Sequence, residues 1–241
     1  MPAAVVGVVF VSALVRSAIG FGDAVVAMPL LAMVTGLKTA SPLVAFMGPT
    51  ISLLILAGSW RKIELRSAGR LVIASLLGIP LGIYGLARLP EGPLKIGLGL
   101  IILLYGLFGL ARPKARIRNE RPWLPWTVGV AAGVLGGAYN TNGPPVVAYG
   151  MLKGWPPEDF RATLSGYFLP TSLMVLAGHG LAGMWTAEVL TSYLWSLPAI
   201  VLGVLLGGLL NKRIPQALFA RLVNGCLAAM GVLLLARTLI R

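Results

Sequence analysis

Two short polar interruptions of an otherwise apolar sequence carry the residues best suited to bind a ligand. The first runs from Arg16 to Asp23 and the second from Gly133 to Pro145. Glycines allow two helix ends to turn and a ligand to approach the backbone closely. Asp23 and Asn142 are suitable N-cap residues for the helices that follow, and Pro144 suits a first helical turn. Free N–H groups at a helix start form an anion site together with the helix dipole, so the pattern predicts anion binding, the alternative being that these residues only cap and pack helices.

Individual side chains in and near the breaks add to this prediction. Asn140, Thr141 and Asn142 supply neutral hydrogen-bond donors. Arg16 could attract an anion, or its side chain could extend to the lipid headgroups. Asp23 could carry a coupling proton, with N-capping as the alternative. The predicted substrate-binding residues are Gly20, Phe21, Gly22, Asp23, Gly136, Gly137, Asn140, Thr141, Asn142, Gly143, Pro144, Thr50, Thr171 and Arg16.

The composition indicates whether these residues belong to a soluble protein or to a membrane protein. Of 241 residues, 57% are hydrophobic and 11% are charged, whereas a soluble domain carries about 25% charged residues. This excludes a disordered chain and disfavours a soluble one, so we expect a polytopic helical membrane protein. The net charge of +13 is explained by basic loops facing the cytoplasm rather than by nucleic-acid binding. The single cysteine, Cys226, allows no intrachain disulfide, and we find no enzymatic motif and expect no metal or other cofactor.

Apolar runs of two lengths determine the expected architecture. About 13 helical residues rise only about 20 Å, which is less than the roughly 30 Å of the hydrocarbon core. The short runs around each break therefore predict a broken helix or a re-entrant hairpin, and loop charges favour the hairpin, with two tilted full crossings as the alternative. His179 is predicted in a loop or at the interface. The short runs are 2–14, 24–37, 126–139 and 146–152, and those of spanning length are 41–60, 71–89, 94–111, 161–178, 189–210 and 222–240.

The two halves of the chain resemble each other. The segment from Pro90 to Arg112 matches that from Pro215 to Arg237 in length, and Pro49-Thr50 resembles Pro170-Thr171. Three spans follow each short pair, so the second half must be inverted. We therefore predict an all-α membrane protein of two inverted repeats, each a re-entrant or broken helical hairpin plus three transmembrane helices. Inverted repeats with broken elements are typical of secondary transporters. The expected divisions are a first repeat at 1–111, a basic cytoplasmic linker at 112–125 and a second repeat at 126–241.

The breaks also resemble the signatures of a known family. Gly20-Phe21-Gly22-Asp23 with Pro29-Leu30, and Gly133, Gly136-Gly137 with Asn142-Gly143-Pro144-Pro145, are similar to the two glycine-rich motifs of the sulfite exporter TauE/SafE family, in which a small residue is common at the position of Asp23. The resemblance implies transport of sulfite, sulfoacetate or another short organosulfonate across the bacterial inner membrane.

The expected partners are a small organic or inorganic anion, the lipid bilayer, a coupling proton and a second copy in a homodimer. An anion channel, a carrier of non-sulfur carboxylates and a non-transporting assembly subunit remain the alternatives.

Overall fold

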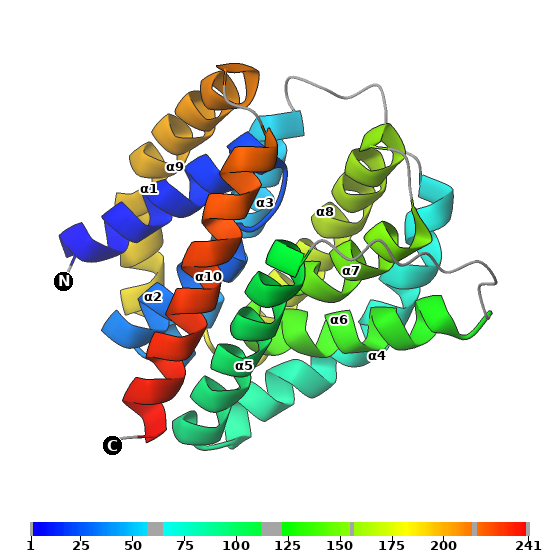
Figure 1. Ribbon diagram of the computed structural model, residues 1–241. Coiled ribbons are helices and arrows are strands. Elements are labelled where there is room, and N and C mark those ends of the chain that lie inside the picture. The colour runs from blue at the N-terminus through cyan, green and yellow to red at the C-terminus, as the bar shows by residue number, and fades with distance from the viewer. Residues whose placement is uncertain (1, 57–64, 112–121, 155–156, 214–215, 240–241) are drawn as a thin grey trace.

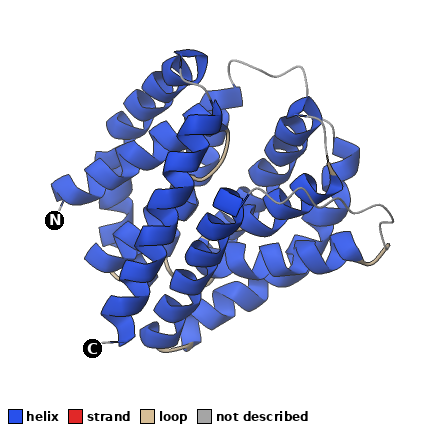
Figure 2. Cartoon of the chain, in the orientation of Figure 1, coloured by secondary structure: helices blue, strands red, loops and turns tan. Residues whose placement is uncertain are grey.

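The computed structural model describes residues 2–56, 65–111, 122–154, 157–213 and 216–239, and the described part is helical without strands (Figure 2). The two predicted breaks separate α1 from α2 and α6 from α7. The helices are α1 (Pro2–Ile19), α2 (Asp23–Val34), α3 (Leu37–Leu56), α4 (Leu65–Arg88), α5 (Glu91–Ala111), α6 (Leu124–Tyr139), α7 (Gly143–Lys153), α8 (Pro157–Leu181), α9 (Ala187–Arg213) and α10 (Gln216–Leu239).

The lengths of these helices confirm a multi-pass membrane protein. Within the described residues, five helices are long and apolar enough to cross a membrane, namely α3, α4, α5, α9 and α10. Helices α1, α2 and α6 are apolar but shorter, as the sequence predicts. Helix α8 covers the predicted run at 161–178 and continues to Leu181, but it is not one of the five.

Three pairs of helices pack closely along their lengths: α1 with α9, α4 with α6, and α5 with α10 (Figure 1). Glycines allow these approaches, because small residues let two helix backbones come close together. A β-carbon at Gly78 on α4 would lie 2.7 Å from the amide nitrogen of Val134 on α6, and one at Gly203 on α9 would lie 2.7 Å from the carbonyl oxygen of Phe10 on α1. A side chain at either position would therefore force the paired backbones apart.

Helices α3 and α8 lie against each other, and α3 also packs on α9 while α8 packs on α4. The short helices complete this interior, because α2 contacts α1 and α3, and α7 contacts α6 and α8. Both breaks are thus brought beside α3 and α8.

The predicted linker at 112–125 falls mostly outside the described residues, which resume at 122, and its basic side chains are not described. Helix α6 begins at Leu124, so the end of the predicted linker already belongs to this helix. The domain boundaries themselves stay predictions.

Candidate functional site

The first break is a turn made by glycines. Gly20 and Gly22 adopt φ angles of 94° and 101°, in the left-handed region that glycine enters without strain. Gly22 occupies the N-cap position of α2, and no side chain caps this helix start. The prediction that Asp23 is the N-cap was therefore wrong, because the chain enters the helix one residue earlier and makes Asp23 the first helical residue.

Asp23 instead forms a buried ion pair across the turn with Arg16. An Nη1 hydrogen of Arg16 is donated to Oδ2 of Asp23 over 2.8 Å, and Nη2 donates to the Ser52 hydroxyl over 2.6 Å. The guanidinium carbon lies 5.4 Å from the ring centre of Phe168, within the range of a cation–π contact. Arg16 is only 7% exposed, so it does not extend to the headgroups, and that alternative was wrong.

The second break is held by hydrogen bonds to neighbouring helices. Asn140 ends α6 with a left-handed φ of 55°, and its amide nitrogen donates to the Ser41 carbonyl on α3 over 2.7 Å. Asn142 occupies the N-cap position of α7, but its side chain makes no capping bond. It donates over 3.0 Å to the Thr171 hydroxyl, which donates in turn to the Tyr167 carbonyl. Because the proton of Thr171 is already used, the nitrogen side of the Asn142 amide must face it.

The two helix starts differ in the backbone donors that they offer. The first N–H groups of any helix lack a partner within it, and α2 carries Asp23, Ala24 and Val25 there. In α7 the second and third residues are Pro144 and Pro145, which have no N–H. The expectation of free N–H groups at both starts therefore holds in full for α2, whereas α7 offers mainly Gly143.

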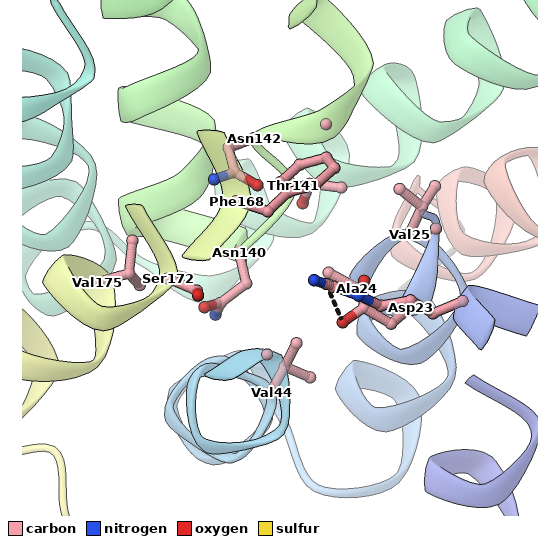
Figure 3. Close-up of a pocket in the computed structure, with 14 residues that line it drawn as sticks. Asp23, Ala24, Val25, Val44, Asn140, Thr141, Asn142, Phe168, Ser172 and Val175 are labelled. Carbon is pink, nitrogen blue, oxygen red and sulfur yellow. Dashed lines mark hydrogen bonds and ion pairs between the residues drawn. The ribbon is translucent and has the colours of Figure 1, made fainter. Parts of the chain in front are cut away.

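A small cavity lies between the two breaks. In Figure 3, Asp23, Ala24 and Val25 line one side, Asn140, Asn142 and Ser172 face them, and Val44 on α3 lies between the two groups. Its volume is about 30 Å³, and a single water needs about 10–15 Å³ of such space. In this conformation the cavity therefore admits only a guest of a few heavy atoms. The lining residues are Arg16, Gly22, Asp23, Ala24, Val25, Val44, Gly48, Asn140, Thr141, Asn142, Gly143, Phe168, Ser172 and Val175.

The lining combines a polar and an apolar part. Polar atoms come from the ion pair, from the turn after α6 and from Ser172, whereas Val25, Val44 and Val175 contribute hydrocarbon. The two charged groups neutralise each other. An anion entering the cavity therefore meets neutral donors directly, and meets a cation only if it competes with Asp23.

The structure brings several predicted residues to the cavity and places others around it. Those that line it are Arg16, Gly22, Asp23, Asn140, Thr141, Asn142 and Gly143; those that do not are Gly20, Phe21, Gly136, Gly137, Pro144, Thr50 and Thr171.

The predicted residues outside the lining have local partners instead. Thr171 holds Asn142 in place. Thr50 pairs with the Tyr193 hydroxyl over 2.6 Å, and Gly137 packs on the backbone of α4.

Sequence reasoning missed one wall of the cavity. Phe168, Ser172 and Val175 of α8 line it, together with Val44 and Gly48 of α3. The spacing of the α8 residues places them on one helix face, but this spacing does not tell whether the face meets protein or lipid. His179 continues that face and is fully buried within α8. Its prediction as a loop or interfacial residue was wrong, because α8 extends past Gly178 to Leu181.

A family model described as "Sulfite exporter TauE/SafE" matches residues 5–234 of the chain. The protein belongs to the sulfite exporter TauE/SafE family. Among the curated proteins, the chain is 25% identical to the "Probable sulfite/organosulfonate exporter TauE" of Cupriavidus necator over 226 residues, covering 90% of this chain and 86% of that protein. No solved structure matches the chain significantly. Membership of the TauE/SafE family confirms the resemblance read from the two breaks, and makes the protein a membrane transporter of the exporter type and not an enzyme.

Proposed function

We propose that the protein is a secondary transporter that moves a small sulfur-containing anion across the bacterial inner membrane. Sulfite, sulfoacetate and other short organosulfonates are the candidate substrates; of these, the cavity in this conformation suits sulfite, and the organosulfonates require it to widen. Family membership supports the class of substrate, as does the name of the Cupriavidus necator relative. The observation that carries the proposal is the cavity, whose lining joins both glycine-rich breaks to the buried cation Arg16.

Binding begins with competition for the guanidinium group of Arg16. This group has five N–H donors, and two of its nitrogens are bonded to Asp23 and Ser52. A sulfonate or sulfite oxygen that approaches from the cavity replaces the Asp23 carboxylate on the guanidinium and accepts further bonds from the start of α2. Asn142, whose side-chain nitrogen donates to the Thr171 hydroxyl and also bonds to the Tyr167 hydroxyl, contributes a donor by exchanging one of these partners for the anion.

A coupling proton on Asp23 would favour the replacement of its carboxylate by the anion on Arg16. Protonation of Asp23 removes its charge and releases Arg16 to the anion, so a proton and an anion are bound more favourably together than separately. The anion and the proton are therefore bound in the same state of the carrier. The homodimer expected from the sequence stays a prediction.

The helix pairing supports two inverted repeats that move against each other. If residues 1–111 and 126–241 are equivalent, α1 corresponds to α6 and α4 to α9. The observed pairs α1–α9 and α4–α6 are then the same contact made twice, and α5–α10 pairs a helix with its own counterpart. A pseudo-twofold axis produces such a pattern. Rocking or sliding of one repeat against the other exposes the cavity to alternate sides of the membrane.

Uptake of radiolabelled sulfite and sulfoacetate into proteoliposomes tests this function. Asn142→Ala removes a cavity donor, and Gly143→Leu fills the cavity beside Phe168, whose ring lies 3.4 Å from where a β-carbon would sit. Both variants should lose transport but should still insert into the membrane and fold. Gly225→Leu is the matched control, because nothing lies within 4 Å of a β-carbon at Gly225.

Three results would count against the proposal. Wild-type uptake rates in both cavity variants would show that the cavity does not lie on the transport pathway. Flux that never saturates with substrate would indicate a channel instead of a carrier, and inhibition by simple carboxylates but not by sulfonates would change the substrate class.

A further inference from the structure

His179 has an unusual hydrogen-bonding state. Its side chain is fully buried, and Nε2 lies 2.9 Å from the carbonyl oxygen of Gly137 on α6. Its other ring nitrogen, Nδ1, has no hydrogen-bond partner, and within the described residues no other buried side-chain nitrogen or oxygen lacks one. Buried polar atoms are nearly always bonded, so the free nitrogen calls for an explanation beyond packing.

The carbonyl partner determines where the ring proton lies. A carbonyl oxygen only accepts, so Nε2 of His179 must donate to Gly137. In the neutral ring the other nitrogen then carries a lone pair. Nδ1 is therefore a basic atom, enclosed by protein and free to accept a proton.

The position of His179 connects two walls of the cavity. Four residues, or about 6 Å of helix rise, separate it from Val175, which lines the cavity on the same face of α8. Its bonding partner, Gly137, precedes the α6–α7 break by one helical turn. A change at this imidazole therefore acts directly on the contact between α8 and the end of α6.

Among the side chains that the structure describes, no counter-ion for a charged imidazole lies on the helices packed against α8. Helices α3, α4 and α6 carry no Asp or Glu. The carboxylate of Glu188 at the start of α9 is exposed, as are the side chains of Lys38, Tyr84 and Arg88.

The tyrosines on α6, α7 and α8 are engaged with other groups. The hydroxyl of Tyr139 donates to the Leu94 carbonyl, Tyr149 pairs with Lys153, and Tyr167 pairs with Ser75. The immediate surroundings are apolar, since Ala45, Ile79, Ile83 and Val175 form a buried cluster there.

We propose that His179 binds a proton at Nδ1 during the transport cycle and so couples protonation to the opening of the α6–α8 contact. This inference rests on the proposed transport function. A protonated ring in the observed conformation would be a buried cation without a carboxylate or an acceptor for its second N–H, which is strongly disfavoured. The protonated protein must adopt a conformation in which Nδ1 reaches water or a new acceptor. Proton binding and conformational change are then linked, each favouring the other.

The chain contains one histidine, so its protonation can be observed without assignment. Protein purified without a polyhistidine tag and labelled with nitrogen-15 in histidine gives one pair of ring-nitrogen NMR signals. At high pH we expect the neutral tautomer with hydrogen on Nε2. As the pH falls from about 8 to about 4, past the ordinary histidine value of about 6.5, we expect Nδ1 to gain a proton together with a change in the protein's conformational exchange. An Nδ1 that stays unprotonated over this range, or a tautomer with hydrogen on Nδ1, overturns the proposal.

Transport measurements with His179→Gln provide the functional test. Glutamine retains an N–H that can be donated to Gly137 but cannot ionise, and Ile83→Val is the control for a small packing change in the same cluster. Sulfoacetate is the probe, since its sulfonate stays ionised across this pH range. We expect His179→Gln to lose the stimulation of uptake by an imposed pH gradient and to retain exchange of labelled for unlabelled sulfoacetate at equal pH.

Each other outcome has a distinct meaning. A full response to the gradient in His179→Gln overturns the role of His179, whatever the response of Asp23→Asn, and leaves Asp23 as the group proposed to bind the coupled proton. Loss of exchange as well shows that His179 is needed for the transport movement itself and not for its coupling to protonation, and this also overturns the proposal. A wild type that moves no labelled anion in either assay refutes the transport function instead, and the NMR spectra then decide the histidine proposal alone.

Discussion

Replacing Asp23 by Asn tests the contribution of the ion pair without changing the shape of the cavity. The substitution removes the negative charge and keeps the shape of the side chain, including an oxygen that can accept from Arg16. Arg16 remains buried, with its bond to Ser52 and its contact with Phe168. Removing one partner of a buried ion pair typically costs about 3–5 kcal/mol of stability. Coulomb's law gives a similar value of about 4 kcal/mol for charges about 4 Å apart at an effective dielectric of 20.

An anion in the cavity should recover part of this loss. If the bound anion compensates the unpaired guanidinium by about half, or roughly 2 kcal/mol, it binds about 30-fold more tightly to Asp23→Asn than to the wild type. The variant should therefore be less stable than the wild type without ligand and should gain more stability from the anion. Release should become slower, so turnover in proteoliposomes should fall although binding improves.

Thermal unfolding in detergent at rising sulfoacetate concentration measures both effects, because a ligand of the native state raises the melting temperature. Ser52→Ala is the control, since it removes a neutral partner of Arg16 and leaves the charges in place. An Asp23→Asn variant with wild-type stability and an unchanged response to the anion would show that the anion does not compete with Asp23 for the guanidinium of Arg16. Complete loss of the response would show that Asp23 contributes to binding directly, and either result refutes the displacement argument.

Three further substitutions test the packing and the hydrogen bonds around the cavity. Gly78→Leu should lower the free energy of unfolding by about 1–3 kcal/mol or more, because α4 and α6 cannot approach with a side chain between them. The control Gly225→Leu, at an open position, should leave the free energy of unfolding unchanged. Equal melting temperatures of the two variants would contradict the packing described for α4 and α6. Thr50→Val should keep wild-type uptake at a stability cost of about 1 kcal/mol, since its hydroxyl bonds to Phe46 and Tyr193 away from the cavity. Thr171→Val should reduce uptake, because it releases Asn142, and the reverse order of the two uptake rates would exclude this role for Thr171.

Much of the fold follows from features that a sequence displays directly. Helix lengths follow from uninterrupted apolar runs, and the breaks at Gly20–Asp23 and Asn140–Pro145 stand out because glycine, asparagine and proline interrupt them. The cavity between these breaks was predictable for the same reason. Backbone with unpaired polar groups is tolerated inside a membrane protein only where protein or a water-filled space surrounds it.

Other features could not be read from the sequence for physical reasons. In a membrane protein, a helix face can be apolar because it packs on protein or because it meets lipid, so the pattern of α8 does not say that Phe168 and Val175 face the interior. The six residues between Arg16 and Asp23 include a glycine turn whose backbone angles decide whether the two side chains meet. His179 lies beside a glycine and close to a loop, which resembles a helix end, yet α8 continues past it.

The central claim is that an anion binds between the two breaks, and anomalous diffraction from bound selenite tests it most directly. Selenite has the shape and charge of sulfite, and selenium scatters anomalously. In crystals of the protein with ordinary methionine, the account predicts one strong anomalous peak within hydrogen-bonding distance of Arg16 and Asn142, with Asp23 turned away from the guanidinium. A peak elsewhere, or an unchanged Arg16–Asp23 pair with no peak at saturating selenite, would contradict it.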